Sequence, residues 1–133
     1  MVHIDAAECV VVTEKRFERF RVNAPYATLT AWDGEGTVNI SIRGEYDLSC
    51  AEASERILEQ VGELVASTER SIVVDLTHTT FFDAAGIKFI LRLEQVGQLA
   101  SSSITTTVRC ADRHVRQVFE LVDLKRLLEA EFD

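Results

Sequence analysis

The chain has 133 residues, of which 47% are hydrophobic and 27% are charged, a composition typical of one globular domain. Its 22 acidic and 14 basic residues give a net charge of −8, which opposes the electrostatic attraction that supplies most nucleic-acid affinity, so neither DNA nor RNA is an expected partner. No apolar run approaches the ~20 residues needed to cross a bilayer, and no basic signal region follows Met1. We therefore expect a cytoplasmic protein without a membrane partner.

The three cysteines, Cys9, Cys50 and Cys110, are odd in number and far apart in the chain. None of them forms a Cys-x-x-Cys pair, so the sequence indicates neither a disulfide framework nor a zinc site. We interpret them as small structural hydrophobes, with a redox role for Cys50 or Cys110 as the alternative. No metal and no other cofactor is expected.

The first 24 residues show no clear hydrophobic period, although residues 9–12 and 17–22 are apolar enough for an edge strand or a short helix. Pro25 ends this segment, because the residue before a proline is disfavoured in helical conformation. We therefore predict an N-terminal extension of unknown role over residues 1–24 and one domain over residues 25–133.

The domain is predicted to begin with a β-hairpin. Residues 27–32 and 37–43 are rich in β-forming side chains, and Asp33-Gly34-Glu35-Gly36 between them supplies glycines that suit a tight turn. A helix is expected from Ser49, because Ser49 and Glu52 have the spacing of a capping box. The residues predicted to face the core recur at helical spacing; they are Ser54, Ile57, Leu58, Val61, Leu64 and Val65.

Strands and helices then alternate. Residues 72–76 form an apolar run typical of a central parallel strand covered on both faces. Asp83 is expected to cap a second helix, and Asp112 a third helix that follows a strand over residues 104–110. The predicted inward residues of these two helices are Gly86, Phe89, Ile90, Leu93 and Val96, and Val115, Val118, Phe119 and Val122. This order predicts an α/β fold with a mixed, largely parallel sheet of four to five strands flanked by helices.

Two motifs within these predicted elements resemble those of the STAS domain, the module of bacterial anti-sigma-factor antagonists. Asp75-Leu76-Thr77, followed by Phe82-Asp83-Ala84-Ala85-Gly86-Ile87, is similar to the strand end and helix start of that family. Upstream, Arg43-Gly44-Glu45-Tyr46-Asp47-Leu48 resembles the family loop that precedes its first helix. The resemblance covers residues 27–130 and implies a single STAS-like domain that acts by binding another protein.

The resemblance implies a partner and a site. In the family, the unphosphorylated antagonist binds an anti-sigma factor with a histidine-kinase-like ATPase fold and releases the sigma factor, until the kinase phosphorylates a serine at the helix start. That serine position is Ala85 here, and Ala84 has no hydroxyl either, so we expect binding without this phosphorylation switch. The expected partner-binding residues are Asp47, Asp83, Ala84, Ala85, Ile87 and Lys88.

Three alternatives stay open. In the first, the chain is a STAS subunit of a larger assembly, such as a stressosome-like scaffold or a lipid-transport accessory complex. In the second, Thr79 or Thr80 is phosphorylated in place of Ala85. An enzyme would require Asp47 and Asp83 to converge in a deep polar pocket, but each carboxylate is also explained as a turn or cap residue, so we expect no catalytic residue. The sequence does not distinguish a monomer from a weak dimer.

Overall fold

The computed structural model describes residues 4–5, 9–13, 18–34 and 36–129 of the chain. Over these residues one sheet contains seven strands in chain order. The strands are β1 (Ile4–Asp5), β2 (Cys9–Thr13), β3 (Glu18–Asn23), β4 (Ala27–Gly34), β5 (Thr37–Tyr46), β6 (Ile72–Phe82) and β7 (Thr106–Arg109). The helices are α1 (Ala51–Thr68), α2 (Ala84–Ala100) and α3 (Arg113–Leu121), with short 3₁₀ turns η1 (Leu48–Cys50) and η2 (Lys125–Leu127).

The mixed α/β sheet flanked by helices is confirmed, and its strand directions follow from the connections. Strands β1 to β5 are antiparallel neighbours, whereas β5, β6 and β7 are parallel and joined through α1 and α2. The N-terminal segment forms strands β2 and β3, so its strand interpretation is correct and its short-helix interpretation is wrong, but β1 and not these strands lies at the edge of the described sheet. The described sheet therefore has more strands than the four to five expected, and its parallel pairing is confined to β5, β6 and β7.

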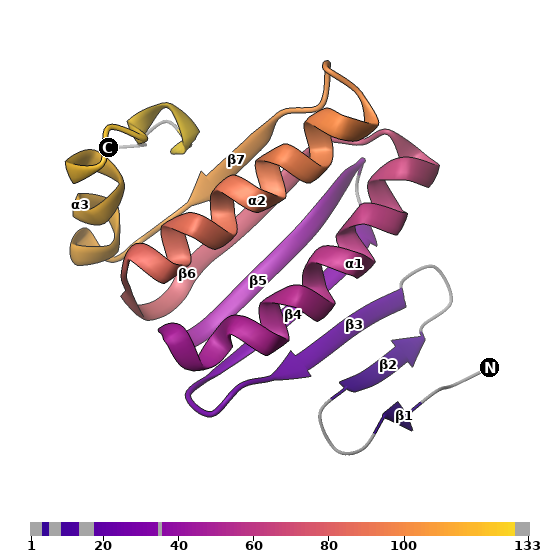
Figure 1. Ribbon diagram of the computed structural model, residues 1–133, viewed down its shortest axis with the longest axis horizontal. Helices are drawn as coiled ribbons and strands as arrows, with labels where there is room; N and C mark the ends of the chain where they lie inside the picture. Colours follow the sequence, from indigo (N-terminus) through magenta and orange to yellow (C-terminus); the bar gives the residue numbers. More distant parts are fainter. Residues whose placement is uncertain (1–3, 6–8, 14–17, 35, 130–133) are drawn as a thin grey trace.

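Both crossover helices cover the same face of the sheet (Figure 1). The order β5, β6, β7 runs in one direction without reversal, and right-handed crossovers then place α1 and α2 on one side. Strand β6 therefore alternates: Ile72, Val74 and Leu76 are fully buried, whereas Val73 and Asp75 are only half-buried. The expectation that this strand is covered on both faces is wrong.

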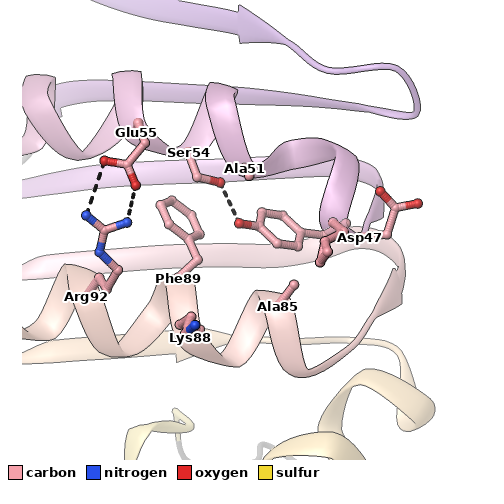
Figure 2. A pocket seen from close by; sticks show the side chains of 10 residues that line it. Asp47, Ala51, Ser54, Glu55, Ala85, Lys88, Phe89 and Arg92 are labelled. Carbon is pink, nitrogen blue, oxygen red and sulfur yellow. Dashed lines mark hydrogen bonds and ion pairs between the residues drawn. The ribbon is translucent and has the colours of Figure 1, made fainter.

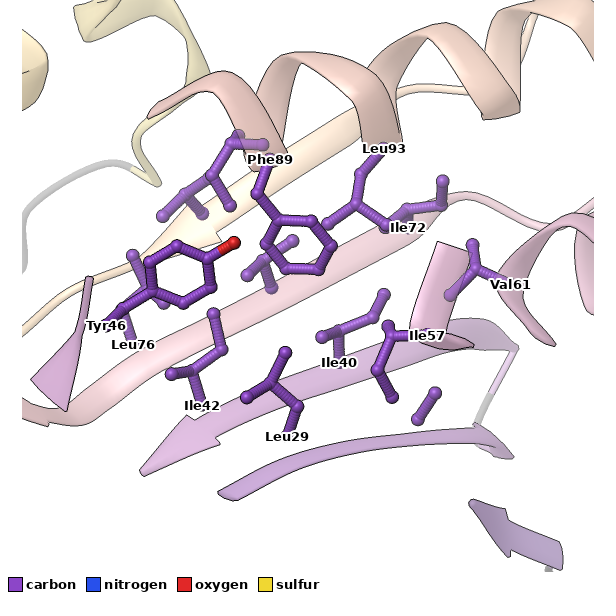
Figure 3. Packing of buried hydrophobic residues seen from close by; sticks show 14 of the residues in the cluster. Leu29, Ile40, Ile42, Tyr46, Ile57, Val61, Ile72, Leu76, Phe89 and Leu93 are labelled. Atoms are coloured by element: carbon purple, nitrogen blue, oxygen red, sulfur yellow. The ribbon is translucent and has the colours of Figure 1, made fainter. Parts of the chain in front are cut away.

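The hydrophobic core lies between the sheet and the helices α1 and α2 (Figure 3). The hairpin residues Val38, Ile40 and Ile42 are 0% exposed, which confirms their predicted inward alternation. The helices contribute a complementary row of buried side chains: Ile57, Val61, Val65, Phe89, Ile90 and Leu93. This layer holds α1 and α2 side by side, with α1 mainly over β3 and β4 and α2 over β6 and β7.

Two of the three predicted N-terminal helix caps are confirmed. Asp83 Oδ1 accepts a hydrogen bond from the Ala85 amide at 3.0 Å, and Asp112 Oδ1 accepts one from the His114 amide at 2.7 Å. The predicted Ser49–Glu52 capping box is wrong, because Ser49 lies inside the turn η1 and donates its hydroxyl to Asp47. Helix α1 begins after that turn without a side-chain cap.

The inward face of α3 ends earlier than expected. Val115 and Phe119 are buried and Val118 is half-buried, as predicted, but Val122 is 47% exposed. The helix ends at Leu121, and Asp123 then adopts a left-handed conformation with φ of 60°, so Val122 does not continue the helical face.

We expect Gly86→Ala to destabilise the fold by ~1–3 kcal/mol, because added volume in a packed core forces its neighbours apart. A Cβ at Gly86 would lie 2.4 Å from Phe82 Cε1, and the Phe82 ring is held by stacking on Phe119 with centroids 5.6 Å apart. The matched control is Gly62→Ala in α1, where a Cβ meets only Val96 Cγ1 at 3.8 Å. Urea denaturation measures both variants; equal stabilities would contradict this account of Gly86.

Candidate protein-binding surface

The two family-like motifs end at the same edge of the sheet. Tyr46 and Phe82 are paired in the parallel register of β5 and β6, so Asp47 and Asp83 leave the sheet next to each other in register. Gly44, in the Arg43–Leu48 motif, has φ of +107°, and a Cβ there would lie 2.4 Å from the Tyr26 carbonyl oxygen. The motif glycine is therefore required both by its backbone conformation and by the close approach of the Tyr26 backbone just before β4.

Both aspartates accept hydrogen bonds from residues two positions further along the chain. Asp47 Oδ1 accepts hydrogen bonds from the hydroxyl and the amide of Ser49, which together lower the pKa of its carboxyl below the ordinary value. Asp83 caps α2 through the Ala85 amide. The cavity beside Asp47 is not lined by Asp83, so the two carboxylates do not face each other across it. The geometry gives no support to the enzyme alternative.

The start of α2 presents three of the expected binding residues. Ala84 is exposed, Ala85 is half-buried toward α1, and Lys88 is exposed one turn later. Ile87 is only 7% exposed and belongs to the core, so its side chain offers little surface to a partner and we remove it from the candidate surface. Sequence reasoning misplaced Ile87 because it follows the motif directly and lies beside the outward-facing Lys88.

Thr79 is not an accessible substitute for the missing serine. It is 1% exposed, and its hydroxyl donates a hydrogen bond to the Ile42 carbonyl at 2.7 Å. Phosphorylation would require breaking that bond and opening the β5–β6 pair. Thr80, by contrast, is exposed and stays a candidate.

A cavity of about 270 Å³ lies between the first turns of α1 and α2, and we call it the α1–α2 cavity. Figure 2 shows Ala51 and Ser54 on the α1 side and Ala85 and Phe89 on the α2 side. One end is spanned by Arg92 and Glu55, which form a two-pronged ion pair between the helices. Sequence motifs did not indicate this cavity, because its walls come from elements far apart in the chain.

Tyr46 packs at the base of the α1–α2 cavity and is 2% exposed. Its ring stacks on Phe89 with centroids 5.6 Å apart and an interplanar angle of 12°. Its hydroxyl is hydrogen-bonded to the Ser54 hydroxyl (Figure 2). Burial raises the pKa of Tyr46 to about 12, since the ionised phenolate would be poorly solvated there.

This raised pKa predicts a loss of stability at alkaline pH. The unfolded chain releases the Tyr46 proton near pH 10 and the folded chain only near pH 12, so stability falls as the pH rises through this window. Each pKa unit corresponds to about 1.4 kcal/mol. Tyrosinate absorbance in a Tyr26→Phe background, where Tyr46 is the sole tyrosine, measures the titration directly. Ionisation of Tyr46 near pH 10 in the folded protein would contradict the burial argument.

The two described thiols lie in surroundings unfavourable to the thiolate. Cys50 is 0% exposed and Cys110 is half-buried, and burial raises the pKa of both thiols. A raised pKa slows thiol chemistry, which favours the structural interpretation over the redox one. The Cys9 side chain lies outside the described residues. Within the described ranges no group of three or more His, Cys, Asp or Glu side chains is placed to hold a metal ion.

The chain is similar to known proteins in sequence and in fold. The model STAS_2, described as the Mlab STAS domain, matches residues 30–129. The anti-sigma-F factor antagonist RsfB of Mycobacterium tuberculosis, in strains CDC 1551 / Oshkosh and ATCC 25618 / H37Rv, is 38% identical over 72 residues, which are 53% of this chain and 57% of RsfB. The chain therefore matches little more than half the length of these curated relatives.

Solved structures share the fold. The unphosphorylated anti-sigma factor antagonist SpoIIAA matches with a TM-score of 0.64 and 19% identity, over 79% of this chain and 89% of that chain. An anti-sigma factor antagonist from Mycobacterium paratuberculosis matches with a TM-score of 0.58 and 22% identity, over 84% and 93%. The phosphorylated form of SpoIIAA from Bacillus matches with a TM-score of 0.57 and 18% identity, over 79% and 92%. No helix in the described part of the chain is long and apolar enough to cross a membrane.

Proposed function

Because the chain belongs to the STAS_2 family, we propose that it is an anti-sigma-factor antagonist that binds an anti-sigma factor and thereby releases a sigma factor. Its similarity to RsfB, whose name states that it antagonises the anti-sigma-F factor, supports this activity. The proposed partner is an anti-sigma factor with a histidine-kinase-like ATPase fold. The proposed setting is the cytoplasm, and the proposed role is regulatory and not enzymatic.

The observation that carries the proposal is the surface at the start of α2. Asp47 and Asp83 bring η1 and the first turn of α2 to one edge of the sheet, where Ala84 and Lys88 are exposed. Short polar caps and small side chains leave this edge open to a second protein. We propose Asp47, Asp83, Ala84, Ala85 and Lys88 as the partner-binding surface.

The regulation proposed for this surface differs from that of SpoIIAA, which is known in unphosphorylated and phosphorylated forms. A phosphate at the start of a helix is compatible with the fold, since free amides and the helix dipole favour negative charge there. It would nevertheless place a charge of about −1.5 to −2 in the contact surface. Ala85 cannot carry that phosphate, so we propose that this chain binds regardless of ATP.

The test uses the purified anti-sigma-F factor that RsfB antagonises, together with any anti-sigma factor that copurifies with the tagged chain from its host. We expect the parent chain to bind with the same affinity in the presence and absence of ATP, and Lys88→Glu to weaken binding. The charge-matched control is Lys125→Glu, an exposed lysine in η2 away from this edge. Equal binding by both folded variants would remove the α2 start from the interface.

A second candidate function is a STAS subunit of a larger assembly. The observation that favours it is the family model, which is described by the Mlab STAS domain and not by an antagonist. Copurification separates the two functions, because an anti-sigma kinase is expected with an antagonist and a transporter ATPase with a lipid-transport accessory subunit. A stressosome-like scaffold would instead appear as a large assembly of STAS proteins.

A further inference from the structure

We infer that the α1–α2 cavity is an anchor site for one aliphatic or aromatic side chain of the partner, flanked on the partner by a carboxylate that pairs with Lys88. This inference rests on the proposed function, because the partner is the anti-sigma factor of that proposal. It adds a specific pocket and a specific chemistry to the surface.

The size of the cavity suits a single side chain. Its volume of about 270 Å³ lies below the ~300–1,000 Å³ typical of pockets that enclose drug-sized ligands. It is wide because the residues facing each other across it, Ala51 on α1 and Ala85 on α2, are both small. A single leucine, methionine or phenylalanine side chain is an occupant of suitable size.

The chemistry of the walls favours an apolar occupant. The rings of Tyr46 and Phe89 form a stacked wall, and the adjoining side chains of Ala51 and Ala85 are methyl groups. Two pairs of polar groups at the cavity bond to each other: the Tyr46 hydroxyl to Ser54, and Arg92 to Glu55. Apart from these two pairs, Asp47 and Lys88, the lining of the cavity is apolar.

The mouth of the cavity indicates what flanks the apolar side chain. Leu48 is 72% exposed at one lip, where it extends the apolar surface of the cavity outward. Lys88 is exposed at the other lip, and no carboxylate of the described residues lies within ion-pair distance of it. An apolar anchor with a neighbouring aspartate or glutamate complements both lips. Central apolar anchors with a polar rim are the arrangement that dominates binding energy at protein interfaces.

The first experiment fills the cavity. Ala51→Phe places a ring in it from the exposed start of α1, and we expect the affinity for the anti-sigma factor to fall by roughly tenfold or more, as at an interface hot spot. The matched control, Ala66→Phe, adds the same ring at an exposed position near the other end of α1 and should bind like the parent. Leu48→Ser should also weaken binding, whereas Leu99→Ser, at a residue 81% exposed at the far end of α2, should not. Melting temperatures check that every variant is folded.

The second experiment identifies the occupant. A photo-crosslinking amino acid at position 48 should label a segment of the anti-sigma factor that carries an apolar residue beside an aspartate or glutamate. Exchanging that carboxylate for lysine should weaken binding to the parent chain and restore binding to Lys88→Glu. Labelling of a segment without such a pair, or no restoration, would overturn the inference.

The outcomes separate this inference from the proposed function. If Lys88→Glu weakens binding while a folded Ala51→Phe binds like the parent, the surface is correct and the anchor cavity is wrong. If the parent binds no anti-sigma factor, the proposed function fails and the inference fails with it.

Discussion

Ala85→Glu is expected to fold and to lose roughly 100- to 1,000-fold in affinity for the anti-sigma factor, because an unpaired charge buried in an interface costs several kcal/mol. Ala85 is half-buried on the side of α2 that faces the α1–α2 cavity. Negative charge at a helix N-terminus is itself favourable by ~0.3–1 kcal/mol. The fold therefore tolerates the carboxylate, and the bound complex does not.

Calorimetric titration measures the affinity of Ala85→Glu, and thermal unfolding measures its stability. The conservative control is Ala85→Ser, whose side chain has nearly the same size as alanine and should bind like the parent unless a kinase modifies it. Binding by folded Ala85→Glu equal to that of the parent would show that position 85 lies outside the interface.

Phe89→Ala is expected to lower the free energy of unfolding by ~3–5 kcal/mol, the range for removing a large aromatic side chain from a core. Phe89 is 3% exposed, and its ring stacks on Tyr46 between the two helices. Domains of this kind are stable by only ~5–15 kcal/mol, so this single change removes a large share of the total. No other ring stacks on Tyr46 in the same nearly parallel arrangement within the described residues.

Chemical denaturation measures this loss against Leu99→Ala in the same helix, where the side chain is 81% exposed and the expected change is within ~0.5 kcal/mol. If Phe89→Ala cost no more than Leu99→Ala, the stack on Tyr46 would not hold the two helices in place. The α1–α2 cavity would then lack the rigid wall on which the anchor inference depends.

Features with a local cause could be predicted from the sequence. Asp83 and Asp112 are correct N-caps because a short acceptor side chain before an apolar helical run satisfies its own nearby amides. The predicted burial of Val38, Ile40 and Ile42 is correct because successive side chains of a strand point to opposite faces of the sheet. The family motifs placed Asp47 and Asp83 at one edge, since consecutive parallel strands end together.

Features with a tertiary cause could not be predicted. Ser49 matches a capping box in sequence, yet the Asp47 carboxylate competes for its hydroxyl and folds it into a 3₁₀ turn. Thr79 is an alternative phosphorylation site in the sequence, but the β5–β6 pairing buries it against the Ile42 carbonyl. The α1–α2 cavity depends on how Tyr46 and Phe89 meet across two elements, which no local pattern encodes.

The most direct measurement of the central claim follows the release of a sigma factor from its complex with the anti-sigma factor. The chain is first incubated with the anti-sigma kinase and ATP, and then added to that complex. Ala85 cannot accept phosphate, so we predict equal release with and without ATP for the parent chain, and ATP-dependent loss of release only for an Ala85→Ser variant that the kinase modifies. Loss of release by the parent after incubation with ATP, with phosphate found on Thr80 or elsewhere in the chain, would contradict the account.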